Sequence, residues 1–223
     1  ARRELTAAIK AAARRQLAAG GSGELAMRGI ARELGMASSA IYRYFASRDE
    51  LITALVIDAY DDLGAAAEAG LAAASDAAPH EQWVRVCGRV RQWAFAHPHE
   101  YALIYGTPVP GYQAPSITIG PASRVGLVLA NIVAYAQRTG QVADVPVTLP
   151  VPVARDADRL AAALELAMPP AVAAALVAAW AQLFGLVSFE LFGQFEQVVW
   201  ARDAFFDHAA GYLARSVGLT PSA

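Results

Sequence analysis

The residues with the greatest chemical capacity in this sequence gather between positions 38 and 48. Hydroxyl, phenol and guanidinium groups recur there, in Ser38, Ser39, Tyr42, Arg43, Tyr44 and Arg48, and Arg28 adds a positive charge upstream. Such groups are common donors to the phosphate oxygens of DNA, and arginine also recognises base edges in the major groove. We expect Tyr42, Tyr44 and Arg48 to contact phosphates. Ser38, Ser39 and Arg43 are expected nearer the bases; in the alternative, the two tyrosines pack against their own domain.

Two short helices around a sharp turn are needed to present these side chains. Each expected helix, over 27–34 and 38–45, has apolar residues four positions apart, namely Ile30 with Leu34 and Ile41 with Phe45. That spacing gives each helix one apolar stripe, and Gly35 between them tolerates the positive φ of a tight turn. The pattern predicts a helix-turn-helix, whose second helix enters the major groove.

A longer string of residues carries a family resemblance. It runs through Ile30-Ala31, Leu34-Gly35-Met36, Ile41-Tyr42-Arg43-Tyr44-Phe45 and Ser47-Arg48-Asp49-Glu50-Leu51. In order and spacing this string resembles the tetracycline-repressor (TetR) family of bacterial transcriptional regulators, and the phrase from Trp180 to Glu190 looks like the tryptophan-containing eighth helix of one subgroup. The resemblance implies a homodimeric repressor that binds a double-stranded DNA operator and is released by a small-molecule effector.

Two positions depart from the family pattern. Ala26 and Ala37 stand where a threonine and a serine often cap the two helices of the motif, and a lost cap usually costs about 1 kcal/mol. Ser38 or Ser39 is a candidate to replace the second cap. Further on, Ser47 and Glu50 match a capping box at the start of the next helix.

Composition separates a basic head from an acidic body. Residues 1–50 hold nine Lys/Arg and five Asp/Glu, net +4, whereas residues 51–223 hold nine and fifteen, net −6. This asymmetry predicts that only the head meets a polyanion, and the resemblance implies a DNA-binding domain over 1–50 and an effector-binding and dimerisation domain over 51–223. The single cysteine, Cys87, cannot form an internal disulfide, and the first 20 residues hold no apolar signal block, so we expect a cytoplasmic protein.

The fold class is expected to be all-α, because apolar residues recur at spacings of three and four and alanine is abundant. Helices are predicted over 2–19, 27–34, 38–45, 48–74, 80–97, 98–106, 121–138, 156–167, 170–193 and 195–217. Two proline-rich stretches, 106–115 and 142–153, are predicted as loops that are either functional or simple connectors.

The last two predicted helices have apolar residues on two sides. The resemblance implies that they form a four-helix dimer interface, for which the candidates are Leu183, Gly185, Val187, Leu191, Phe205 and Tyr212. The alternative is a bundle within one chain.

Aromatic residues of the body are the candidates for an effector site, namely Trp93, Tyr101, Tyr105, Tyr112, Trp180 and Phe184. Mostly apolar walls with a few polar tips are typical of small-molecule sites, although such stripes are also ordinary core. We expect a small effector that is apolar or aromatic rather than anionic. Arg89 and Arg91 are the side chains that would overturn this expectation.

Other functional classes are disfavoured by the sequence. We find no phosphate-binding loop and no catalytic constellation, and we expect no cofactor. His97 and His99 are two apart and do not share a helix face, so no metal site is expected. The alternative function is a helical small-molecule-binding protein or enzyme whose head only resembles a DNA-binding module. A membrane helix over 168–189 is also considered and disfavoured, because its ends lack basic anchors.

Overall fold

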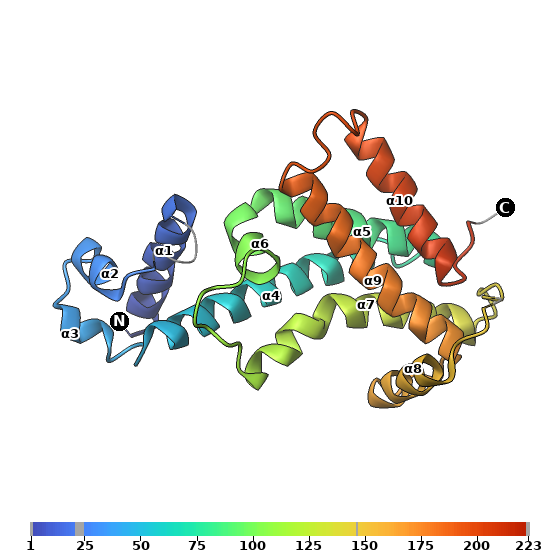
Figure 1. The fold of residues 1–223 in the computed structure, drawn as a ribbon, viewed down its shortest axis with the longest axis horizontal. Helices are drawn as coiled ribbons and strands as arrows, with labels where there is room; N and C mark the ends of the chain where they lie inside the picture. Colours follow the sequence, from blue (N-terminus) through green and yellow to red (C-terminus); the bar gives the residue numbers. More distant parts are fainter. Residues whose placement is uncertain (1, 21–24, 146, 222–223) are drawn as a thin grey trace. The chain divides into compact units, whose positions relative to one another are not determined.

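The computed structural model describes residues 2–20, 25–145 and 147–221. Its helices, in chain order, are α1 (Arg2–Gly20), α2 (Met27–Glu33), α3 (Ser38–Ile41), α4 (Arg48–Ala72), α5 (Pro79–Ala96), α6 (Pro98–Tyr105), the 3-10 turn η2 (Ser116–Thr118), α7 (Ile119–Arg138), α8 (Val151–Ala163), α9 (Pro170–Leu191) and α10 (Arg202–Ser216) (Figure 1). The described residues contain no strand beyond a single bridge between Val142 and Leu219. The prediction of an all-α fold is confirmed.

Two helix starts differ by several residues from the predicted ones. Helix α8 begins at Val151 rather than at residue 156, because Pro150 and Pro152 occupy the cap and first turn, where a missing N–H costs nothing. Helix α10 begins only at Arg202, whereas the sequence predicted a start at residue 195. Gly193 and Gln197 both have positive φ, which interrupts the helix in the intervening segment.

The second helix of the helix-turn-helix is also shorter than predicted. Helix α3 ends at Ile41, and the backbone N–H groups of Arg43 and Tyr44 then bond the carbonyls three residues back. That i to i−3 pattern is a tight 3-10-type continuation. Tyr42, Arg43 and Tyr44 therefore extend from the turn that prolongs α3, not from the α-helix itself.

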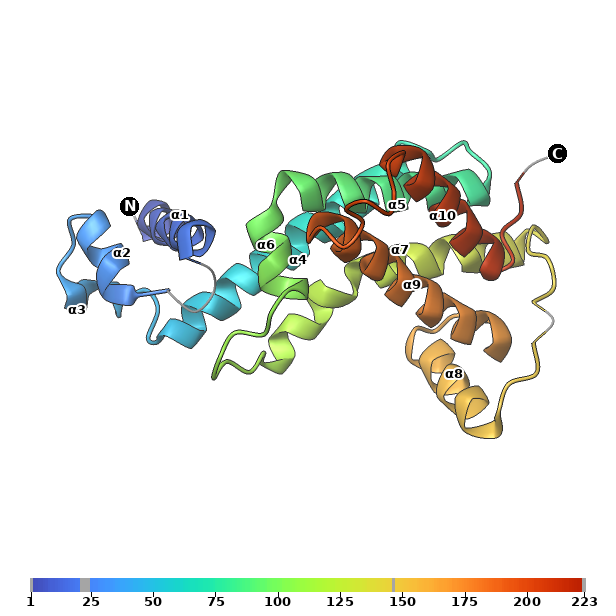
Figure 2. The same cartoon turned by 45° about the horizontal axis from the view of Figure 1, so that its top comes forward.

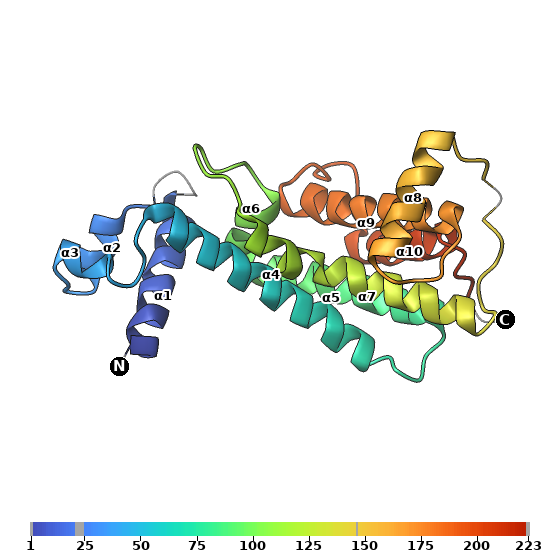
Figure 3. The same ribbon diagram turned by 90° about the horizontal axis from the view of Figure 1, so that it is seen from below.

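The chain divides into two compact units. Unit 1 comprises residues 1–62 and 96–122, and unit 2 comprises 63–95 and 123–223. Unit 1 therefore contains the helix-turn-helix together with α6 and the segment that follows it. Figure 3 shows that segment leaving α6 as a long loop before the chain enters α7.

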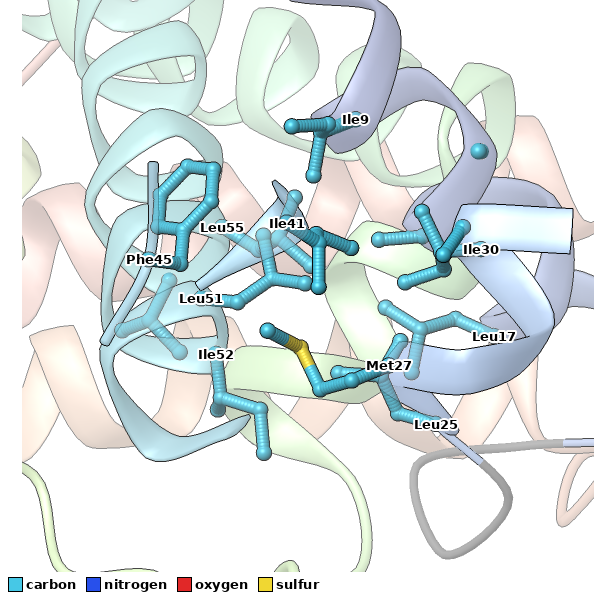
Figure 4. Packing of buried hydrophobic residues seen from close by; sticks show 14 of the residues in the cluster. Ile9, Leu17, Leu25, Met27, Ile30, Ile41, Phe45, Leu51, Ile52 and Leu55 are labelled. Carbon is cyan, nitrogen blue, oxygen red and sulfur yellow. The ribbon is translucent and has the colours of Figure 1, made fainter. Parts of the chain in front are cut away.

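Unit 1 is organised around an aliphatic core. Side chains from α1 to α4 converge there, including Ile9, Leu17, Ile30, Ile41 and Leu51 (Figure 4). Each of these five is at least nine-tenths buried. Burying such side chains supplies about 1.5–3 kcal/mol each, so this core fixes α2 and α3 on α1 and α4.

Unit 2 is a helical bundle in which α8 and α10 each pack against α9 (Figure 2). By length and composition alone, residues 116–138 and 170–191 would be apolar enough to cross a membrane. The second of these, α9, buries residues such as Val172, Leu183 and Val187 within the unit. It also carries Glu190, whose side chain is paired with Arg91 of α5, an arrangement that suits the core helix of a bundle.

Candidate nucleic-acid interface and effector site

The helix-turn-helix is held by backbone geometry and packing without side-chain caps. Ala26 and Ala37 occupy the two N-cap positions, and neither helix has a side-chain cap hydrogen bond, so Ser38 and Ser39 do not replace the missing hydroxyl. The turn itself passes through Gly35, which has a φ of +64°, as the sequence predicted. Gln16 of α1 compensates in part at α2, because its Oε1 accepts the Ala26 N–H at 3.0 Å.

Most of the predicted DNA-contacting residues form one exposed group. Arg28 lies on α2, Ser38 and Ser39 open α3, and Tyr42 and Arg43 follow it; all five are exposed. The same helices bury Ile30 and Ile41 in the core of unit 1. The surface left open on α2 and α3 is therefore polar and positively charged, with hydroxyl and guanidinium donors close in sequence. Such a surface can donate to phosphates and base edges.

Tyr44 and Arg48 are engaged within the head. Tyr44 is half-buried against the core of unit 1, and the Arg2 guanidinium carbon lies 5.9 Å from the centre of its ring. Arg48 donates from Nε to the Leu25 carbonyl at 3.1 Å. Both residues therefore help to build the head, whatever contact with DNA they make in addition.

Sequence reasoning gave too little weight to two arginines. Arg2 packs on the ring of Tyr44, so this contact holds the start of α1 against the turn that follows α3. Arg32 is exposed in the last turn of α2, on the same short helix as Arg28. Its spacing of four from Arg28 was the signal that could have identified it, because residues four apart share a helix face.

The start of α4 shows the predicted capping box with one shift. The Glu50 N–H donates to Ser47 Oγ at 3.1 Å, while the Glu50 carboxylate accepts the Ala46 N–H at 2.6 Å. This capping box marks the point where the turn after α3 ends and the long helix α4 begins.

The predicted effector residues fall into separate groups. In unit 1, Tyr101 and Tyr105 of α6 have ring centres 5.2 Å apart, and Tyr105 stacks edge-on against Tyr60 of α4 at 6.0 Å. Burial raises the pKa of the Tyr105 and Tyr60 phenols above their usual value of 10.0, so both rings stay neutral. Tyr112 lies in the same unit: it packs against the core of unit 1, its hydroxyl lies 3.0 Å from that of Thr53, and its phenol contributes to the raised pKa of Tyr60.

The remaining three effector candidates lie in unit 2. Trp180 and Phe184 stack edge-on across α9 with ring centres 5.9 Å apart, and Trp93 is buried on α5. The indole Nε1 groups of Trp83 and Trp180 are both buried and have no hydrogen-bond partner. A buried donor without an acceptor costs about 1–3 kcal/mol, so these two groups are suited to a bound acceptor.

Two arginines would favour an anionic effector: Arg91 is paired with carboxylates, and Arg89 is exposed to solvent. Arg91 donates to both carboxylate oxygens of Glu190, at 2.7 and 2.5 Å, and bonds Asp203 at 2.7 Å. The bond with Glu190 raises the pKa of Arg91, and Asp203 adds to that rise although burial opposes it. Arg89 is exposed and donates to Gln92 at 3.3 Å. Neither guanidinium is left as an unpaired positive group inside unit 2.

The remaining candidates for a reactive or metal-binding side chain are Cys87, His97 and His99. Cys87 is fully buried, and burial raises the pKa of its thiol, so it is a neutral core side chain. His97 and His99 are exposed, and Glu100 lies 3.9 Å from Arg14. Across the described ranges, no group of three or more histidine, cysteine or carboxylate side chains is arranged to hold a metal ion.

The predicted dimer residues separate into buried and exposed sets. Leu183 and Val187 are fully buried inside unit 2, so they support α9 from within and do not form its open surface. Leu191 is half-buried. Gly185, Phe205 and Tyr212 are exposed, and they are accompanied by apolar residues that the sequence analysis did not select: Phe189, Phe192, Val198 and Trp200.

Comparison with known proteins agrees with this geometry along the chain. A family model described as bacterial regulatory proteins, tetR family, matches residues 9–55, and one described as tetracyclin repressor-like, C-terminal domain, matches residues 83–213. The HTH-type transcriptional regulator Mb1846 of Mycobacterium bovis is 37% identical over 200 residues, which cover 87% of this chain and 84% of that protein.

Solved structures share the fold. The regulatory protein SCO4313 matches with a TM-score of 0.75 and 31% identity, over 95% of this chain and 96% of that one. RolR, crystallised with resorcinol, matches with a TM-score of 0.54 and 16% identity, over 100% of this chain and 96% of its own. Because the family models and a relative with 37% identity span most of the sequence, the chain belongs to the TetR family and is a DNA-binding transcriptional regulator.

Proposed function

We propose that the protein is a cytoplasmic, homodimeric repressor that leaves its operator when a small neutral aromatic molecule binds the body. The observation that carries the proposal is the exposed basic and hydroxyl surface on α2 and α3, opposite a fully apolar core. Two such heads fit DNA only when their recognition segments lie about one helical turn apart, roughly 34–36 Å. A change in that separation abolishes binding. The proposal retains the division into a DNA-binding part, 1–50, and an effector and dimer part, 51–223.

The dimer is supported by the open apolar surface of α9, α10 and the segment between them. Trp200 is 82% exposed and Tyr212 is 60% exposed, and Phe189, Phe195 and Phe205 form a chain of edge-on ring contacts beside them. Large clustered apolar side chains on a surface mark an interaction site. A second copy of the same surface, related by a two-fold axis, would cover them.

A neutral aromatic effector is supported by the composition of the candidate lining. Trp93, Trp180 and Phe184 supply apolar walls, and the free Trp180 Nε1 supplies one directed donor. Gly126 of α7 leaves room beside this donor, since a Cβ there would lie 3.8 Å from it. RolR, which shares the fold, was crystallised with resorcinol, a neutral aromatic diol. A phenol can stack on these rings and accept from the indole.

The DNA assignment is tested by separating phosphate contacts from base contacts. After selection of an operator from random duplexes, we expect Arg43→Ala to erode discrimination between operator and scrambled DNA, by about 1–3 kcal/mol if its base contact is bidentate. Arg48→Ala should weaken both duplexes alike and lower the salt dependence by about one unit of log–log slope per contact. Because Arg48 also bonds the Leu25 carbonyl, Arg28→Ala serves as a second phosphate variant outside that bond. Equal loss for both duplexes with Arg43→Ala would reverse the assignment.

The dimer is tested at Gly185. A Cβ at this exposed position meets no atom within 4 Å in one protomer, so Gly185→Leu should leave the monomer fold intact. In a packed dimer interface the added side chain overfills the contact. We expect light scattering to show a shift toward the monomer mass. Gly88→Leu is the matched control, because a Cβ at Gly88 is also unobstructed, on a helix outside this surface. An unchanged stable dimer would exclude Gly185 from the interface.

The effector class is tested with resorcinol and citrate as probes in competition with operator DNA. Resorcinol or a similar neutral phenol should displace the operator, whereas citrate should not. Trp180→Phe should weaken the response to phenols by about two- to tenfold, as expected for one hydrogen bond, with operator affinity unchanged. A structure in which a polycarboxylate pairs with Arg89 or Arg91 would overturn the assignment.

A further inference from the structure

The start of α2 has neither of the side chains that form a capping box. In that motif the N-cap hydroxyl accepts from the N3 backbone N–H, and a glutamate or glutamine at N3 accepts from the N-cap N–H. In α2 the two positions are Ala26 and Gly29, which carry no such groups. The start of α4, by contrast, has Ser47 and Glu50 for this purpose. Helix α2 therefore needs an acceptor for its first amide from another part of the chain.

Gln16 of α1 supplies that acceptor. Its Oε1 accepts the Ala26 N–H at 3.0 Å, which is the bond that an N3 glutamine would make from within α2. Its Nε2 fills the space that an N3 side chain would take, since a Cβ on Gly29 would lie 2.8 Å from it. Any larger residue at position 29 would therefore displace the Gln16 amide. The glycine leaves the room that the glutamine occupies.

The peptide group that leads into α2 is held on both sides. Its N–H, from Ala26, bonds Gln16 of α1. Its C=O, from Leu25, accepts from Arg48 Nε of α4 at 3.1 Å. The side chain of Leu25 is buried in the core of unit 1 together with that of Ile30 (Figure 4), and these are the two positions of a hydrophobic staple. The entry into α2 is thus fixed by α1, α4 and the core.

We propose that Gln16 is a positioning residue for DNA binding: it replaces, from α1, the capping side chain that α2 lacks, and Gly29 makes room for it. Arg28 is exposed in the first turn of α2, two residues after the N-cap. Its position therefore depends on where that turn begins. The consequence for DNA rests on the proposed function, in which Arg28 contacts the operator, whereas the cap itself does not.

The cap is tested by hydrogen exchange of the Ala26 amide in the full chain without DNA. Gln16→Ala should speed this exchange by about two- to tenfold, as expected for the loss of one hydrogen bond. Gln16→Glu keeps the Oε1 acceptor and should keep the protection. Gln113→Ala, which removes an exposed glutamine elsewhere in unit 1, is the matched control and should leave the exchange unchanged.

Changes at the two empty cap positions sharpen the test. Alanine in place of glycine normally stabilises a helix. Gly29→Ala should nevertheless speed Ala26 exchange as Gln16→Ala does, because the new Cβ displaces the Gln16 amide. In the Gln16→Ala background the same Gly29→Ala change should instead raise the Tm. Adding Ala26→Ser and Gly29→Gln to Gln16→Ala builds a capping box within α2, and it should restore slow exchange at residue 26.

The effect on DNA is tested by a double-mutant cycle with Arg28. Gln16→Ala should weaken binding of a selected operator by about two- to tenfold. Arg28→Ala should weaken it as well, and the double variant should lose less than the product of the two single losses, because Arg28 is already displaced when Gln16 is absent. The variant with the rebuilt capping box should recover the operator affinity.

The outcomes separate this inference from the proposed function. Ala26 exchange that is unchanged in both Gln16→Ala and Gly29→Ala would overturn the cap, and losses of affinity that simply multiply would overturn the positioning role. If Arg28→Ala does not weaken operator binding, the proposed DNA-binding surface of α2 is wrong, and the exchange measurements still decide the cap.

Discussion

The two compact units differ in how completely their buried polar groups are satisfied. Four buried side-chain atoms have no hydrogen-bond partner among the described residues: His80 Nε2, Trp83 Nε1, Gln137 Oε1 and Trp180 Nε1. All four lie in unit 2, and none lies in the described part of unit 1. Unit 1 has an aliphatic core built from α1 to α4. Among the described residues, the buried polar groups without a partner are therefore confined to unit 2.

Exposed apolar side chains follow the same division. Unit 2 exposes Phe189, Trp200, Phe205 and Tyr212, whereas the large apolar residues exposed in unit 1 are Tyr42, Ile117 and Ile119. A monomer rarely leaves a large apolar patch open to water. The unpaired polar atoms of unit 2 are consistent with the proposed ligand, and its exposed apolar side chains are consistent with the proposed second subunit.

The largest expected effect is in the head core. Ile41 is fully buried, so Ile41→Ala should lower the free energy of unfolding by roughly 2–5 kcal/mol and abolish operator binding. All four tryptophans, at positions 83, 93, 180 and 200, lie in unit 2. Tryptophan fluorescence should therefore keep its native spectrum at a denaturant concentration where circular dichroism already reports loss of helix. Ile41→Val is the control, with a loss of about 1 kcal/mol. Simultaneous loss of both signals would show that the units unfold together.

The next effect concerns the buried ion pair between Arg91 and Glu190. Glu190 is nearly fully buried against Arg91, whereas the side chain of Asp203 is 90% exposed. Glu190→Ala should cost about 2–3 kcal/mol, below the usual figure for a broken buried pair because Arg91 retains Asp203. Asp203→Ala should have a much smaller effect in the same thermal unfolding experiment. Equal losses would mean that burial does not decide the strength of this network.

A matched pair of glutamines tests the contrast directly. Gln82 donates to the carbonyls of Ala74 and Ser75 at 3.2 and 3.3 Å, whereas Gln137 Oε1 has no partner. We expect Gln82→Met to destabilise by about 1–2 kcal/mol, because it removes the donor to the Ala74 and Ser75 carbonyls, of which Ala74 keeps the Ala77 N–H. We expect Gln137→Met to be neutral or mildly stabilising. Chemical denaturation measures both. If Gln137→Met is destabilising instead, the Gln137 Oε1 atom accepts a hydrogen bond from a group that the structure does not include.

The smallest effect is a pH dependence at His80. Burial lowers its pKa below the ordinary 6.5, and Arg215 adds to the shift, while a bond to the Gly211 backbone and the charge of Glu81 oppose it. The unfolded chain therefore takes up the proton first, so stability should fall as the pH decreases through 6.5 and level off below the folded pKa. In His80→Gln this component should be absent, and in His208→Gln, at an exposed position, it should remain. Identical melting curves against pH for wild type and His80→Gln would exclude His80 as the source.

The features that were predicted correctly from the sequence are those that depend on residues close together in the chain. The Gly35 turn, the missing caps at Ala26 and Ala37 and the capping box at Ser47 are all local features, and the structure shows each of them. Tyr112 stays a predicted effector residue on its type alone, and its hydrogen bond with Thr53 could not be predicted, because the two residues are far apart in the chain and leave no periodic signal. The Pro110-Gly111 pair is a signal in the sequence for the turn that precedes Tyr112.

The open surface of α9 was harder to define for the same reason. Leu183 and Val187 have the residue types of an interface, yet α9 is apolar on all sides and its pattern does not show which side faces the core of its own unit. The late start of α10 follows from the backbone at Gly193 and Gln197, and Gln197 is a residue that seldom adopts positive φ.

The burial of Cys87 makes the protein well suited to spectroscopic labelling. The only thiol of the chain is enclosed and neutral, so reagents that attack thiolates will react with a cysteine introduced on the surface and leave the native one unmodified. A single probe at Ser39→Cys would then appear once per protomer, on the proposed DNA-binding surface. In a two-chain assembly the distance between the two probes would follow the separation of the two heads directly.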